Sequence, residues 1–214
     1  MKINIPTKIT IARIVLVTVL IVFLIVCNFL PADAAILQPI GDSGILTVNL
    51  IAAIVFVIAS ATDYLDGHLA RKWNQVTDLG KFLDPIADKM LVNAILVYLC
   101  IGPFGNVAIP WFCVVLMILR DLIVDSMRLM AAKKGKVVAA NIFGKMKTVF
   151  QMVAIPVILL NGWPFTYFDA GWGYGRICLI MIYIATAMSV ISGIIYLKQN
   201  FHIIKEEKND GADV

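Results

Sequence analysis

Carboxylates and small side chains recur at helical spacing in the segment 63–88 of this chain of 214 residues. In each half of the segment they fall on one face of a helix. The residues concerned are Asp63, Asp66, Gly67 and Ala70, followed by Gly80, Asp84 and Asp88. Four unpaired carboxylates in an apolar chain would repel one another and would be costly to remove from water, so they require cations. Carboxylate oxygens unaccompanied by His or Cys favour Mg²⁺, Mn²⁺ or Ca²⁺.

This pattern is typical of a site for phosphoryl chemistry. Four carboxylates can hold two divalent cations about 4 Å apart, the arrangement that clamps phosphoryl oxygens in displacement reactions. The neighbouring small residues would let a phosphate-bearing ligand approach the backbone closely. The alternative is that the acids pair with Arg and Lys side chains at a helix boundary. That alternative explains one or two carboxylates, and we assign Asp78 to it because this residue lies off the small-residue face.

The elements that carry these residues are predicted to be membrane helices. Hydrophobic residues make up 61% of the chain, charged residues make up 15%, and the mean hydropathy is +0.90. Soluble domains are closer to half apolar and a quarter charged. We expect an all-α integral membrane protein with six transmembrane helices, formed as one domain over 1–200 with a polar tail over 201–214. The apolar stretches are roughly 9–30, 46–68, 83–101, 107–131, 140–161 and 176–197.

The distribution of basic residues predicts the orientation. The connections 31–45, 102–106 and 162–175 contain no Lys or Arg, whereas the alternate connections and both ends are rich in them. This asymmetry places both termini and the acidic segment at the cytoplasmic side of the cell membrane. The net charge of +4 then indicates attraction to anionic membrane lipids, with no nucleic-acid partner. A cleaved signal peptide ending near 32–35 is disfavoured because its apolar run would be long.

A second group of charges lies in the fourth predicted helix. Arg120, Asp121, Asp125 and Arg128 are charged residues inside an otherwise apolar stretch, where ions are costly and usually functional. With Lys145 and Lys147 at the start of the next helix, Arg120 and Arg128 would form a basic pocket for an acceptor that carries its own phosphate. The alternative is that these charges pair among themselves and serve the structure.

The acidic segment also resembles a known family. The spacing Asp63-x2-Asp66-Gly67-x2-Ala70-Arg71-x8-Gly80-x3-Asp84-x3-Asp88 is similar to the signature of the CDP-alcohol phosphatidyltransferases. The resemblance implies transfer of a phosphatidyl group from a CDP-linked lipid to an acceptor hydroxyl, with release of CMP. It implies two Mg²⁺ or Mn²⁺ ions on the four aspartates and proton abstraction by Asp88. The CDP donor would be lined by Gly67, Ala70, Arg71, Gly80 and Thr10. Arg13 would either join that lining or extend toward the lipid headgroups.

Three further segments, 4–13, 120–135 and 144–151, resemble members of this family that use glycerol 3-phosphate as the acceptor. The implied reaction converts CDP-diacylglycerol and glycerol 3-phosphate into phosphatidylglycerophosphate and CMP. The resemblance also implies a homodimer. Inositol phosphate, serine and phosphatidylglycerol remain alternative acceptors. A divalent-cation transporter is the alternative from another class, and it is disfavoured because the acids gather at one end of the helices.

Overall fold

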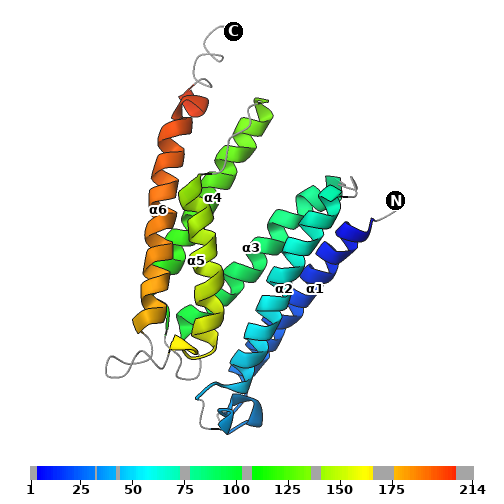
Figure 1. The fold of residues 1–214 in the computed structure, drawn as a ribbon, viewed down its shortest axis with the longest axis vertical. Coiled ribbons are helices and arrows are strands. Elements are labelled where there is room, and N and C mark those ends of the chain that lie inside the picture. Colours follow the sequence, from blue (N-terminus) through cyan, green and yellow to red (C-terminus); the bar gives the residue numbers. More distant parts are fainter. Residues whose placement is uncertain are drawn as a thin grey trace. The chain divides into compact units, whose positions relative to one another are not determined.

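The computed structural model describes residues 4–31, 33–41, 44–72, 78–102, 108–135, 141–165 and 176–205. Side chains are not described for residues 5–6, 64–72, 78–79, 81, 176–178 and 201–205. Within the described part, every long element is helical, which confirms the predicted all-α class (Figure 1). The elements are α1 (Ile5–Asn28), the short 3₁₀ helix η1 (Ala35–Leu37), α2 (Thr47–Lys72), α3 (Asp78–Ile101), α4 (Trp111–Lys133), α5 (Ile142–Leu159) and α6 (Arg176–Lys205).

The helices have the lengths and composition of a membrane protein. Among the described residues, three segments are long and apolar enough to cross a membrane, namely Thr7–Asn28, Ile142–Leu159 and Leu179–Asn200. The described side chains of α2, over Thr47–Asp63, form a further apolar segment that is shorter than these three. Charged residues lower the hydropathy of α3 and α4. The count of six spans and the side of the termini remain predictions.

Two helix ends differ from the predicted stretches. α3 begins at Asp78, before the predicted start at 83, and α6 continues to Lys205, into the predicted polar tail. Hydropathy marks the part of a helix that can lie in lipid, whereas backbone hydrogen bonds continue into flanking polar residues. The remaining tail residues, 206–214, lie outside the described part, and so does the connection 73–77 between α2 and α3.

Contacts divide the chain into two compact units, of which the first comprises residues 1–108 and 155–175. Here α1, α2 and α3 pack against one another (Figure 1). α1 contributes a buried stripe at helical spacing. Its apolar part is Val17, Leu20, Leu24 and Cys27, and toward the helix start the stripe continues as Thr7, Thr10 and Arg13. The buried face of α1 therefore changes from apolar to polar along its length.

The second unit comprises residues 109–154 and 176–214, and in it α4 packs along α6. The buried face of α6 includes Ala185, Ser189 and Ser192, and small side chains of this kind allow helices to approach closely in membranes. Val124 and Met127 of α4 form a buried apolar cluster with Tyr196 of α6.

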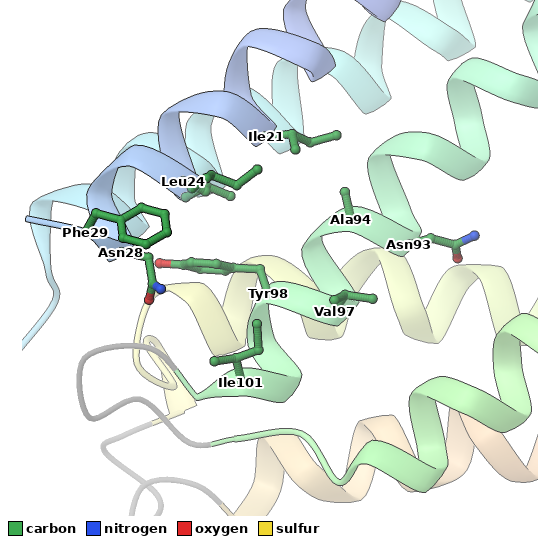
Figure 2. Close-up of a pocket in the computed structure, with 10 residues that line it drawn as sticks. Ile21, Leu24, Asn28, Phe29, Asn93, Ala94, Val97, Tyr98 and Ile101 are labelled. Carbon is green, nitrogen blue, oxygen red and sulfur yellow. The ribbon is translucent and has the colours of Figure 1, made fainter.

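A cavity of about 500 Å³ lies between α1 and α3 of the first unit (Figure 2). Tyr98, which lines it, donates a hydrogen bond of 2.8 Å to the Asn49 side-chain oxygen in α2. The nearest lining residue on α1, Ile21, is roughly 16 Å along the helix from Thr10, at 1.5 Å per residue. None of the described aspartates is among the residues that line the cavity. Its lining includes Ile21, Leu24, Phe29, Val97, Tyr98 and Ile101.

Candidate functional site

The predicted metal-binding aspartates lie on two helices of the first unit. Asp63 and Asp66 are in the second half of α2, and Asp84 and Asp88 are in the first half of α3. Asp84 is exposed and Asp88 is half-buried, while Gly80, one turn before Asp84, is buried. Their spacing of four residues places both carboxylates on the same face of α3.

α1 joins these two helices through two polar side chains. The Thr10 hydroxyl donates a hydrogen bond of 2.8 Å to Oδ1 of Asp84. The Arg13 guanidinium forms an ion pair with Oδ1 of Asp63 through Nη1. Thr10 and Arg13 are one turn apart, where Cβ atoms of a helix are about 5–6 Å apart. The two contacts therefore bring a carboxylate of α2 and a carboxylate of α3 to adjacent positions beside α1.

The burial of Arg13 decides between its two predicted placements. Both Thr10 and Arg13 are only 2% exposed, so Arg13 does not extend toward the headgroups. A buried guanidinium needs an anionic partner because an unpaired buried charge is costly. Asp63 supplies that partner. The donor-binding role predicted for Thr10 stays a prediction, and the structure adds its contact with Asp84.

The carboxylates described here fit a site for hard divalent cations. The Asp63 side chain is 43% exposed and Asp84 is exposed, so solvent and ions can reach both. Their donor atoms are oxygens only, as Mg²⁺ and Mn²⁺ prefer. Among the described side chains no three acidic, His or Cys residues form a group. The fourth predicted ligand, Asp66, and the predicted donor residues Gly67, Ala70 and Arg71 have side chains outside the described part.

A buried ionic network occupies the second unit. We call it the Asp121 network, formed by Arg120, Asp121, Lys147 and Ser192. Asp121 accepts a hydrogen bond of 3.0 Å from Arg120 and one of 2.6 Å from Lys147. Arg120 also donates a bond of 2.5 Å to the Ser192 hydroxyl. The exposed side-chain fractions are 14% for Arg120, 17% for Asp121 and 6% for Lys147. The network thus links α4, α5 and α6.

Two glycines provide the space for the Arg120 side chain. A Cβ atom on Gly144 of α5 would lie 2.8 Å from Nη2 of Arg120, and one on Gly193 of α6 would lie 3.0 Å from its Cγ. Both distances are shorter than ordinary contacts, so a side chain at either position would displace Arg120. The structure therefore requires small residues here for close approach of the helices.

The predicted acceptor residues have different environments. Arg120 belongs to the Asp121 network, while Arg128 is exposed and its guanidinium carbon lies 5.8 Å from the centre of the Tyr196 ring. Lys145 is exposed, whereas Lys147 is buried and contacts Asp121. Of the two lysines that the sequence places in the basic pocket, Lys147 is therefore the one that joins the Asp121 network. Its spacing to the buried residues Gln151, Ala154 and Ile158 places it on the buried face of α5.

Comparisons with known proteins agree with the geometry. Residues 3–195 match the family described as CDP-alcohol phosphatidyltransferase. A Bacillus subtilis protein named CDP-diacylglycerol–glycerol-3-phosphate 3-phosphatidyltransferase is 38% identical over 202 residues, which cover 94% of this chain and 97% of the relative. Relatives with the same name occur in Mycoplasma pneumoniae, 35% identical over 94% of this chain and 89% of the relative, and in Haemophilus influenzae, 34% identical over 92% and 94%.

Proposed function

The chain belongs to the CDP-alcohol phosphatidyltransferase family, and we propose that it transfers the phosphatidyl group of CDP-diacylglycerol to glycerol 3-phosphate. The acceptor hydroxyl forms a new P–O bond with the phosphatidyl phosphorus, and the diphosphate P–O bond breaks. The products are phosphatidylglycerophosphate and CMP, and the hydroxyl proton passes to a base. The observation that carries this proposal is similarity along nearly the full length of relatives that bear the name of this reaction.

We propose that Asp63, Asp66, Asp84 and Asp88 hold two divalent cations, Mg²⁺ or Mn²⁺. When bound, such cations supply positive charge that neutralises the diphosphate and stabilises the departing CMP. Asp88, half-buried and one turn after Asp84 on α3, is the base that accepts the proton of the acceptor hydroxyl. The contacts of Asp63 and Asp84 with α1 support this assignment, because they hold two of the carboxylates beside each other.

The donor and the acceptor bind to different parts of the chain in this proposal. Gly67, Ala70, Arg71, Gly80 and Thr10 line the CDP portion of the donor. The acceptor phosphate binds near Arg120, Arg128, Lys145 and Lys147. Two buried cations share the single carboxylate of Asp121, so the Asp121 network retains positive charge, and exposed Arg128 and Lys145 add to it. A phosphate dianion is the acceptor group that such an environment favours.

The reaction joins a membrane lipid to a water-soluble acceptor, and the apolar helices of the chain place it at a membrane. We propose six spans, with both termini and the active site at the cytoplasmic side of the cell membrane. The lack of basic residues in 31–45, 102–106 and 162–175 supports this orientation. We also propose one catalytic domain over 1–200, in agreement with the family match over 3–195, and assembly as a homodimer.

An acceptor panel tests the proposed function directly. Purified protein is supplied with CDP-diacylglycerol and Mg²⁺ or Mn²⁺, and CMP release is followed with each acceptor in turn. We expect CMP release with glycerol 3-phosphate, none with EDTA, and recovery when excess Mn²⁺ is restored. A reaction without acceptor measures background hydrolysis. CMP release only with inositol phosphate, serine or phosphatidylglycerol would overturn the assigned acceptor.

Arg128→Ala is expected to raise the KM for glycerol 3-phosphate about ten-fold while kcat changes little. The reason is that Arg128 would supply an exposed charge that binds the acceptor phosphate equally in the ground state and the transition state. Initial rates at varied acceptor concentration measure the effect. Leu129→Ala, which changes an exposed neighbour, is the control. An unchanged KM would show that Arg128 does not bind the acceptor and has only a structural contact with the Tyr196 ring.

A further inference from the structure

We propose that Thr10 and Arg13 are positioning residues for the metal site, with α1 acting as its third wall. Each side chain holds one oxygen of a carboxylate, Asp84 and Asp63 respectively, and so fixes the orientation of that carboxylate. The inference rests on the proposed function, because it takes Asp63 and Asp84 as ligands of divalent cations. It assigns to α1 a part of the site that the acidic motif itself does not contain.

The exposure of the four side chains shows why positioning is needed. Thr10 and Arg13 are 2% exposed, whereas the Asp63 side chain is 43% exposed and Asp84 is exposed. An exposed aspartate samples several rotamers, and its carboxylate has no fixed direction unless a partner holds it. Here the partners are buried, and each contacts Oδ1 of its carboxylate. Each aspartate can thus be held by α1 on one oxygen while it remains accessible from solvent.

The apolar part of α1 fixes the height and the rotation of these two partners. Val17, Leu20, Leu24 and Cys27 are buried on the same stripe as Thr10 and Arg13. Sliding α1 by one turn or rotating it would expose or mispack these residues. The packing of the whole helix therefore determines the distance between the two held carboxylates. Two cations that share four carboxylates depend on that distance.

The two positioning residues differ in charge, and this difference decides which one tests the inference. Partners that orient a metal ligand typically contribute 10–100-fold to metal affinity. Removal of the Arg13 charge would have two opposing effects, because it releases Asp63 and also removes a cation that repels the metal. Thr10 is neutral, so its replacement by an apolar residue leaves the charge of the site unchanged while it removes the hydrogen bond to Asp84. Thr10 therefore gives the clearer measurement.

Binding of Mn²⁺ to the full-length protein in the absence of substrate tests the inference, with free Mn²⁺ followed by electron paramagnetic resonance. We expect Thr10→Val to weaken Mn²⁺ binding about ten-fold or more, and Thr10→Ser, which keeps the hydroxyl, to remain within about three-fold of the unmodified protein. Thr18→Val is the matched control, because Thr18 lies on the same helix, is exposed, and donates a hydrogen bond to the Ile14 carbonyl of α1 itself. It should bind Mn²⁺ normally.

The outcomes separate this inference from the proposed function. Normal Mn²⁺ affinity in Thr10→Val would overturn the inference and leave the metal set intact. Equal weakening in Thr10→Val and Thr10→Ser would assign the effect to packing and would also overturn it. Failure of the unmodified protein to bind Mn²⁺ would overturn the metal set itself. A contact of Thr10 with the donor alone would raise the KM for CDP-diacylglycerol without changing Mn²⁺ affinity, which is the fourth distinguishable result.

Discussion

Asp88→Asn is expected to lower kcat by at least about 100-fold while the protein keeps its fold. Asparagine has the same size as aspartate, and Asp88 is only half-buried, so the substitution should disturb packing little. It removes both a negative charge at the proposed metal site and the group that accepts the proton of the acceptor. General-base catalysis typically contributes about 10²–10⁴-fold. The measurement is CMP release at saturating CDP-diacylglycerol and glycerol 3-phosphate.

A titration with Mn²⁺ separates the two roles of Asp88. If Asp88 acted only as a metal ligand, high Mn²⁺ would restore much of the lost rate, whereas loss of a base persists at saturating metal. Val97→Ala is the control on the same helix, since Val97 is 47% exposed and lies far along α3 from the acids. Near-normal turnover in Asp88→Asn would remove this residue from the mechanism.

Asp121→Asn should have the largest effect on stability. The substitution leaves the Arg120 and Lys147 side chains, 14% and 6% exposed, facing each other without a carboxylate. Breaking a buried pair by removing one partner typically costs about 3–5 kcal/mol, because the remaining charge is left uncompensated. For a chain of this size that corresponds to a decrease in Tm of roughly 6–20 °C. Thermal unfolding of the purified protein in detergent measures it.

A second substitution tests whether the loss arises from the network. In the Asp121→Asn background, Lys147→Met removes one of the two like charges and should restore part of the stability. Ser126→Ala is the control on α4, because the Ser126 hydroxyl is exposed and bonds to the Leu122 carbonyl of its own helix. Strictly additive losses in the double variant would show that Asp121 and Lys147 do not interact energetically.

Much of this architecture could be predicted from the sequence because hydropathy and helical spacing act locally. The apolar runs predicted each long helix, since a segment without charges has few alternatives in lipid. The spacing of Asp84 and Asp88 predicted that they share a face of α3 for the same reason. The ends of α3 and α6 were less predictable, because polar residues can extend a helix beyond the lipid.

The partners of these residues could not be predicted in the same way. Whether Arg13 is buried depends on how α1 is rotated against α2 and α3, and whether Lys145 or Lys147 meets Asp121 depends on the rotation of α5. Rotation is decided by packing over the whole helix, and no single motif specifies it. For Arg13, the rotation of α1 follows from the whole stripe of buried residues along that helix. For Lys147, the rotation of α5 follows from the buried residues at helical spacing from it, beginning with Gln151.

The Arg13–Asp63 ion pair also has a consequence for biogenesis. The two residues are 50 positions apart, so α1 leaves the ribosome about 3–10 s before its partner at 5–20 residues per second. During that interval Arg13 is an uncompensated positive charge near the start of an apolar segment. Such a charge favours keeping the N-terminal end of α1 on the side of the membrane where the chain is synthesised. Once α2 arrives, the same charge pairs with Asp63 and α1 can bury it. One side chain would thus first orient the nascent chain and then help assemble the helices.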